Sequence, residues 1–102
     1  MPDITPAELH QRQQAGENLH ILDVRETWEA EESRIPGSQN IPLGTLPDKL
    51  ADLADLADLK DQEVIVHCKG GGRSASAKAF LTQQGFTNVR NLLGGIAAYQ
   101  AG

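Results

Sequence analysis

The sequence contains a single cysteine, Cys68, so no disulfide can form within the chain. A structural zinc site takes about four ligands, often several cysteines. One cysteine and three scattered histidines supply such a site poorly, so we expect no metal. A lone cysteine in a chain without an apolar leader segment at its N-terminus is typical of the reducing cytoplasm, where we expect this protein to work.

Positive charge, aromatic rings and long apolar runs are also scarce. Nine Lys and Arg against 14 Asp and Glu give a net charge of −5, which excludes the basic stripe of a nucleic-acid-binding protein. No apolar run approaches the ~20 residues that span a bilayer, so we expect no membrane partner. Only 4% of residues are aromatic, which predicts an aliphatic core. The length of 102 residues predicts one domain, 1–102, with one modest core.

Helix and strand patterns alternate along the chain. Thr5-Pro6-Ala7-Glu8 is a capping box that predicts a helix to about Ala15. Apolar segments at 19–24 and 64–66 predict buried strands. The remaining predicted elements are a helix at 26–32, an extended piece at 40–43, a helix at 73–85, a strand at 89–92 and a short helix at 96–99. This alternation predicts an α/β fold with a mainly parallel sheet and helices on both faces.

A triplet repeat of Leu, Ala and Asp runs through residues 50–59. Leucine at every third position drifts around a 3.6-residue helix by about 60° per step. Leu46, Leu50 and Leu53 then share one face, while Leu56 and Leu59 progressively leave it. We expect a helix whose first half packs and whose end frays, and slipped duplication of a short unit explains the repeat without a function.

The chemical centre of the sequence is Cys68, which follows a buried strand and precedes a glycine-rich loop. Ligands of parallel sheets bind at the carboxyl ends of strands. A glycine-rich loop that leads into a helix turns its N–H groups inward and forms an anion cradle, which lowers the pKa of a thiol. We therefore expect Cys68 to be a nucleophile toward an anionic substrate. The candidate substrate-binding residues of the loop are Lys69, Gly70, Gly71, Gly72, Arg73 and Ser74.

Simpler explanations exist for each of these residues. A lone cysteine is usually a small buried apolar residue, but an inert one does not need three glycines and two cations beside it. A tight turn explains one or two of the glycines. The spacing excludes a phosphate loop of the Walker A type. We expect the His67 side chain to point away from Cys68, because alternate residues of a strand face opposite ways, and we assign it no catalytic role.

Asp23 and Arg25 end the neighbouring predicted strand. Both can therefore reach the rim of the same pocket. They can equally form a structural salt bridge that holds their own loop. The sequence leaves these two interpretations open, and we include both residues among the candidate substrate-binding positions.

Together these motifs resemble the rhodanese family. The segment from Cys68 to Ser74 is similar to the family's active-site loop, C-x-x-G-x-R-S, with Gly71 at the glycine position. The first conserved box of the family is matched by Leu22-Asp23-Val24-Arg25, Glu29, Ile35-Pro36-Gly37 and Asn40-Ile41-Pro42-Leu43. Its closing segment is matched by Gly85-Phe86 through Val89 and by Leu93-Gly94-Gly95-Ile96. The resemblance covers nearly the whole chain, and its departures, Ala30, Ser33-Arg34 and His67, concern the rim of the site.

The resemblance implies a single rhodanese-like domain with a mainly parallel five-stranded sheet between two layers of helices. It implies a sulfurtransferase in which the Cys68 thiolate takes sulfane sulfur from thiosulfate or a related donor, forms a persulfide and passes the sulfur to cyanide or a cellular thiol. It implies no cofactor. A protein sulfur acceptor, such as an enzyme of cofactor or tRNA thiolation, stays open as a partner.

Two other functions compete with this interpretation. Phosphatases and arsenate reductases of related fold carry one residue more between Cys and Arg than the four at 69–72 of this chain, which makes a larger cradle. A module that only binds a partner usually lacks the cysteine, which is present here. A sulfur carrier for one cellular acceptor would use the same chemistry with a different partner.

Overall fold

A computed structural model describes residues 3–52 and 58–101. Its sheet has four parallel strands in the order β2-β1-β3-β4. The strands are β1 (Ile21–Asp23), β2 (Ser38–Asn40), β3 (Glu63–His67) and β4 (Asn88–Asn91). The expectation of five strands is wrong. Ile4 forms only an isolated parallel bridge with Leu92, because the chain enters a helix at Pro6 directly afterwards.

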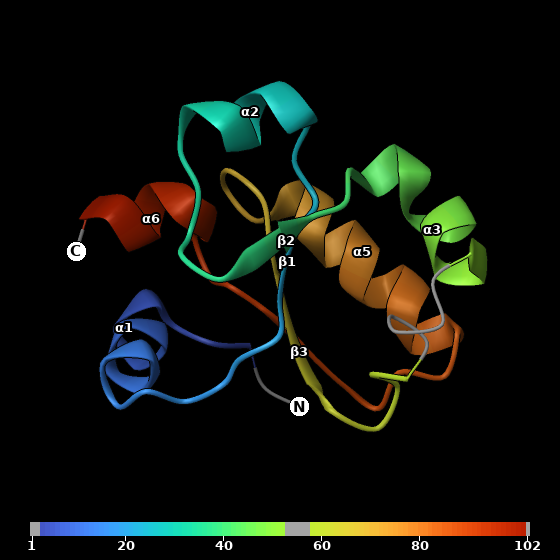
Figure 1. The fold of residues 1–102 in the computed structure, drawn as a ribbon, viewed down its shortest axis with the longest axis horizontal. Helices are drawn as coiled ribbons and strands as arrows, with labels where there is room; N and C mark the ends of the chain where they lie inside the picture. Colours follow the sequence, from blue (N-terminus) through green and yellow to red (C-terminus); the bar gives the residue numbers. More distant parts are fainter. Residues whose placement is uncertain (1–2, 53–57, 102) are drawn as a thin grey trace.

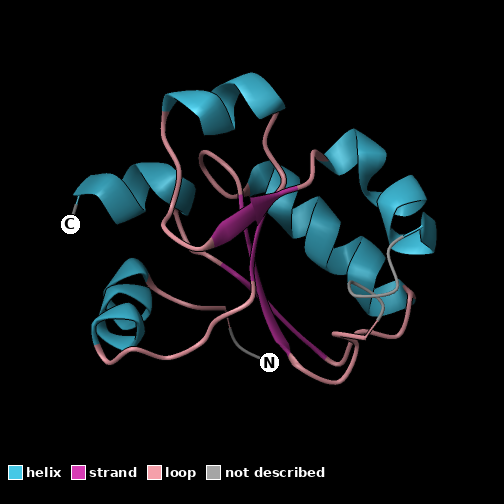
Figure 2. Cartoon of the chain, viewed as in Figure 1, coloured by secondary structure: helices cyan, strands magenta, loops and turns pink. Residues whose placement is uncertain are grey.

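Helices cover both faces of the sheet, as the sequence predicts (Figures 1 and 2). One layer holds α1 (Pro6–Gln14) and α6 (Gly95–Ala101), and the other holds α3 (Leu46–Asp52) and α5 (Gly72–Gln83). The short helix α2 (Thr27–Glu32) follows β1 at the carboxyl edge of the sheet, and the 3-10 turn η1 (Leu43–Thr45) precedes α3. Within the described residues no helix is both long and apolar enough to cross a bilayer.

The alternation of side chains along β3 builds two cores. Val64 and Val66 pack with α3 and α5, whereas Ile65 packs with α1 and α6. All three side chains are fully buried, because a parallel strand covered on both faces has no solvent side. This two-sided burial explains why the strand appears in the sequence as a continuous apolar run.

Helix α1 begins as its capping box predicts. The Thr5 hydroxyl oxygen accepts a hydrogen bond of 3.1 Å from the Glu8 backbone N–H, and Pro6 occupies the first helical position. Ala15 caps the other end, and Gly16 follows with a φ of 78°. The predicted helix is therefore confirmed to within a residue at each end.

The leucine repeat follows its prediction only in its first part. Leu46 is fully buried and Leu50 packs beside it against the same core, as expected for the first half of α3. Leu53 and Leu56 lie outside the described residues. Leu59 was expected to leave the packed face, but it is partly buried against this core, because it lies in a turn and not on a continued helix.

Candidate active site

Cys68 lies directly after β3, at the carboxyl edge of the sheet. The residue is 2% exposed and packs with Val64 and Val66 in the core shared with α3 and α5. His67 is fully buried on the opposite side, and its two ring nitrogens have no hydrogen-bond partner among the described residues. Burial lowers the pKa of His67. The strand thus separates the imidazole from the thiol.

The loop after Cys68 turns through Gly71, the residue before α5. Gly71 has a φ of 114°, a conformation that glycine adopts without steric cost, and its N–H donates to Cys68 Sγ over 3.1 Å. Gly70 and Gly72 have no positive φ. A Cβ atom on any of the three glycines would meet nothing within 4 Å. The turn therefore requires one glycine, and the absence of side chains at the other two leaves the outer side of the loop open.

Opposing effects act on the pKa of Cys68. Burial alone raises it, because a charged sulfur loses its hydration. Hydrogen bonds from the Ser74 hydroxyl and from the backbone N–H groups of Ser74, Gly71 and Gly70 lower it, and the net pKa lies below the usual value of a thiol. The loop is therefore suited to hold a negative charge on sulfur.

Ser74 and Asn91 form a buried polar pair behind the sulfur. The Ser74 Oγ atom lies 3.4 Å from Cys68 Sγ and donates to Asn91 Oδ1 over 2.6 Å. The Asn91 Nδ2 group donates to the Gly71 carbonyl oxygen over 3.2 Å. Asn91 could not be predicted as a site residue, because a single asparagine in a strand gives no chemical signal in the sequence.

Arg73 and Glu29 form a two-pronged ion pair. The Arg73 guanidinium donates to the two Glu29 carboxylate oxygens over 2.6 and 3.0 Å. This contact lowers the pKa of Glu29 to about 2. Asp23 is not available to Arg73, because its carboxylate binds Arg25. The pair ties the start of α5 to α2.

Asp23 and Arg25 bind each other. The Arg25 Nε and terminal N–H groups donate to the Asp23 carboxylate over 2.9 and 2.7 Å. Arg25 also donates to the Ser33 carbonyl oxygen over 2.7 Å, which ties both ends of α2. Asp23 is fully buried and Arg25 is 4% exposed. The salt bridge of the second interpretation is therefore present, and Arg25 also lines a pocket beside the Cys68 loop.

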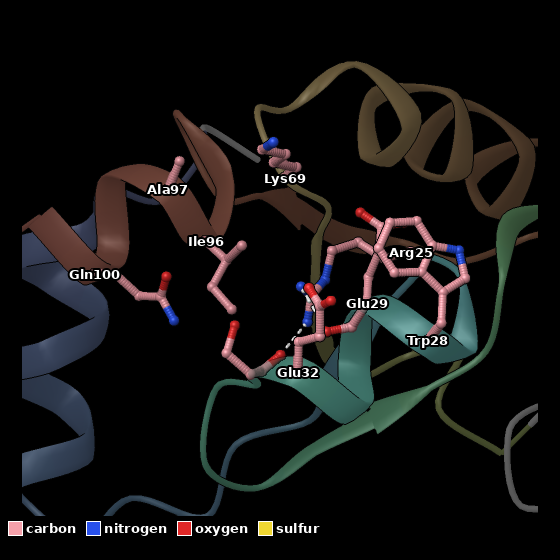
Figure 3. A pocket seen from close by; sticks show the side chains of 9 residues that line it. Arg25, Trp28, Glu29, Glu32, Lys69, Ile96, Ala97 and Gln100 are labelled. Atoms are coloured by element: carbon pink, nitrogen blue, oxygen red, sulfur yellow. Dashed lines mark hydrogen bonds between the residues drawn. The ribbon is translucent and has the colours of Figure 1, made fainter.

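A pocket of about 180 Å³ lies beside the loop, between α2 and α6 (Figure 3). Lys69 is exposed and contributes to its wall next to Cys68. Ile96 and Gln100 of α6 line one side of this pocket, and Trp28 of α2 lines the other. Trp28 is 61% exposed. The structure thus places Lys69 at the mouth of a cavity that adjoins the glycine loop.

The first turn of α6 holds the loop from the other side. The Ile96 N–H donates to the Cys68 carbonyl oxygen over 2.9 Å, and the Ala97 N–H donates to that of Lys69 over 3.2 Å. Gly95 has a φ of 63°, and a Cβ atom there would collide with both carbonyl oxygens. The paired glycines before this helix were the available sequence signal for this close approach.

The assembled site presents a buried sulfur, hydrogen-bond donors aimed at it and an open approach over glycines. Such a site supports nucleophilic attack by a thiolate and stabilises negative charge on the product. Among residues 3–52 and 58–101, no group of three or more His, Cys, Asp or Glu side chains could hold a metal ion.

A family model and several known proteins match this chain over nearly its whole length. The model of the rhodanese-like domain matches residues 5–102. A putative sulfurtransferase of Bacillus subtilis, YtwF, is 36% identical over 98 residues, which is 96% of this chain and 89% of that protein. A sulfurtransferase of Allochromatium vinosum is 33% identical over 97 residues, or 95% and 86%. The human single-domain sulfurtransferase TSTD1 superimposes with a TM-score of 0.85 at 26% identity, over 99% of this chain and 96% of that one.

These similarities span nearly the full length of each partner and include relatives named for sulfur transfer. They support sulfur transfer of the rhodanese type. The chain belongs to the rhodanese-like domain family.

Proposed function

We propose that this protein moves sulfane sulfur from thiosulfate, or a related donor, through a persulfide on Cys68 to a thiophilic acceptor such as cyanide or a cellular thiol. The observation that carries the proposal is the 3.1 Å hydrogen bond from the Gly71 N–H to Cys68 Sγ. Open space over the three loop glycines supports it, because a donor can approach there. The sulfurtransferase names of the relatives point to the same chemistry.

In the first step the Cys68 thiolate attacks the outer sulfur of thiosulfate. A new sulfur–sulfur bond forms, the bond between the two thiosulfate sulfurs breaks, and sulfite leaves with the electron pair of that bond. The outer sulfur of the persulfide then carries the negative charge. The loop N–H groups, directed at the sulfur, would hold this charge as an oxyanion hole holds oxygen.

In the second step the acceptor attacks the outer sulfur of the persulfide. With cyanide a carbon–sulfur bond forms and thiocyanate leaves. The sulfur–sulfur bond returns its electron pair to Cys68, which restores the thiolate. Neither step needs a cofactor or an external oxidant.

Two cations fit the charge of this donor. Thiosulfate is a dianion, and Lys69 is exposed beside Cys68 at the mouth of the adjoining pocket. Arg73 follows Gly72 in the loop, where its ion pair with Glu29 keeps the start of α5 in place. We assign Lys69 to attraction of the donor, Arg73 to the shape of the cradle, and Gly70, Gly72 and Ser74 to its lining.

The acceptor in the cell is a thiol in this proposal, either a small molecule or the cysteine of a partner protein. Trp28 exposes a large apolar surface beside the pocket, which would suit contact with a protein. The cytoplasm fits this cycle, because its reducing conditions supply thiols and keep Cys68 reduced.

A thiosulfate:cyanide assay tests the proposal. The wild-type protein should release thiocyanate with turnover, whereas Cys68→Ser should release none above background. A phosphatase assay on the same samples serves as the comparison. Equal thiocyanate release by the two proteins, or phosphatase activity without thiocyanate release, would show the proposed function to be wrong.

A further inference from the structure

The side-chain amide of Asn91 contacts two of the residues that donate to the sulfur, Ser74 and Gly71. Asn91 ends β4 and is 8% exposed. Its Oδ1 atom lies 2.6 Å from Ser74 Oγ, and its Nδ2 group donates to the Gly71 carbonyl oxygen over 3.2 Å. Ser74 and Gly71 in turn contact Cys68 Sγ. Asn91 therefore reaches the nucleophile only through these two residues.

These contacts fix the orientation of the amide. A flipped amide would place Oδ1 against the Gly71 carbonyl oxygen, which has no proton to donate. It would also place an N–H group 2.6 Å from Ser74 Oγ, shorter than N–H···O bonds usually are. The Ser74 hydroxyl is therefore the donor in its contact with Asn91.

The Ser74 hydroxyl has one proton and three acceptors. They are Asn91 Oδ1 at 2.6 Å, the Gly71 carbonyl oxygen at 3.1 Å and Cys68 Sγ at 3.4 Å. A charged acceptor binds a hydroxyl proton more strongly than a neutral amide oxygen does. The Ser74 hydroxyl therefore donates to Asn91 Oδ1 while the sulfur is neutral, and turns toward the sulfur when the sulfur becomes charged.

The backbone of Asn91 is held in place by the start of the chain. Its N–H donates to an Asp3 carboxylate oxygen over 3.0 Å, and its carbonyl oxygen accepts from the Ile4 N–H over 3.1 Å. These hydrogen bonds hold the end of β4 at a fixed position beside the loop. The amide can therefore hold Ser74 and Gly71 at constant distances from the sulfur.

We propose that Asn91 is a positioning residue of the sulfur site, which fixes the Gly71 and Ser74 donors around Cys68 Sγ and accepts the Ser74 hydrogen bond until the sulfur becomes charged and accepts it instead. The inference rests on the proposed function, in which the charged sulfur is the nucleophile. Its test follows the ionisation of Cys68 and needs no turnover.

Asn91→Asp keeps the size of the side chain but removes the donor to Gly71 and adds a negative charge that binds the Ser74 proton firmly. The midpoint of Cys68 alkylation by iodoacetamide should rise by about one pH unit. With thiosulfate as the substrate, kcat should fall about tenfold while KM changes less than about twofold, because Asn91 is buried and we expect no contact between it and thiosulfate. The matched control is Gln84→Glu, which makes the same amide-to-carboxylate change at an exposed residue at the far end of α5, roughly 15 Å from Ser74 along the helix and beyond one Debye length, and should keep the wild-type midpoint.

Asn91→Ala, which removes both contacts without adding charge, should also raise the midpoint. If both Asn91 variants keep the wild-type midpoint and only melt at lower temperature, Asn91 merely supports the fold and the proposal is wrong. If neither Asn91 variant folds, Ser74→Ala provides the test. Loss of the hydroxyl should raise the alkylation midpoint, and an unchanged midpoint would overturn the proposed role of the Ser74 hydrogen bond. A wild-type protein that never takes up sulfur would instead disprove the proposed function, whatever the midpoints are.

Discussion

The charge on a single sulfur atom depends on a few short contacts. Cys68 is 2% exposed, and such burial favours the neutral thiol. The loop N–H groups and Ser74 reverse this preference, and none of them carries a charge. The sequence predicts the direction of the pKa shift from the glycine-rich loop. The net pKa shift depends on hydrogen bonds of 3.1 to 3.4 Å to the sulfur. The spacing of residues in the sequence does not specify their geometry.

The two cations of the loop should respond differently to substitution. Lys69 is exposed, so Lys69→Ala should raise KM for thiosulfate several-fold, equivalent to about 1 kcal/mol, with kcat and melting temperature unchanged. Arg73 donates two hydrogen bonds to the Glu29 carboxylate, and the single ammonium group of a lysine cannot reproduce this bidentate geometry. Arg73→Lys should therefore lower kcat about tenfold and lower the melting temperature.

Steady-state kinetics and thermal melts on these variants measure both effects, and Glu29→Gln should resemble Arg73→Lys because it breaks the same pair. If Arg73→Lys matches the wild type, Arg73 supplies only charge and its structural role is wrong.

His67 should make the fold sensitive to mild acid. Because burial lowers the pKa of His67, the unfolded chain binds a proton more readily than the folded one. Stability is therefore complete above the ordinary histidine pKa of about 6.5 and declines as the pH falls below it, by up to about 1.4 kcal/mol per pH unit. His67→Phe removes this titration, so between pH 7 and 5.5 it should lose less free energy of unfolding than the wild type. Urea unfolding at the two pH values measures the difference, and equal losses would contradict the assignment.

The close contact between the first turn of α6 and the Cys68 loop can be tested by substitution of Gly95. Gly95→Ala forces a side chain into the left-handed region and against the Cys68 and Lys69 carbonyl oxygens. The matched control is Gly37→Ala, because Gly37 has a φ of 82° but open space around it. Both variants should pay the backbone cost of about 1–2 kcal/mol. Only Gly95→Ala should displace the loop, which alkylation rates of Cys68 and sulfur uptake would report. Equal rates in the two variants would show that this contact does not shape the site.

The elements themselves could largely be predicted from local sequence. The capping box of α1, the apolar run of β3 and the glycine before α5 each specify their element through short-range physics. The extent of the sheet could not be predicted in this way. Pairing of Ile4 with Leu92 depends on two segments far apart in the chain, and it ends after one bridge because Pro6 begins α1.

Distant parts of the chain meet around the sulfur. Asp3 and Ile4 hold the backbone of Asn91, and α2 supplies Glu29 to the start of α5. The sequence predicts Cys68 and its loop because they are contiguous. It does not predict the contacts of Asn91 or the pairing of Arg73 with Glu29, because these contacts arise only when the sheet brings separate segments to one edge.

Intact-mass spectrometry after incubation with thiosulfate tests the central claim most directly. The wild-type protein should gain one sulfur atom, about 32 Da, at Cys68, and cyanide should remove it. Cys68→Ser should gain nothing. An unchanged wild-type mass under conditions of thiocyanate release, or the same gain in Cys68→Ser, would contradict a Cys68 persulfide as the carrier of sulfur.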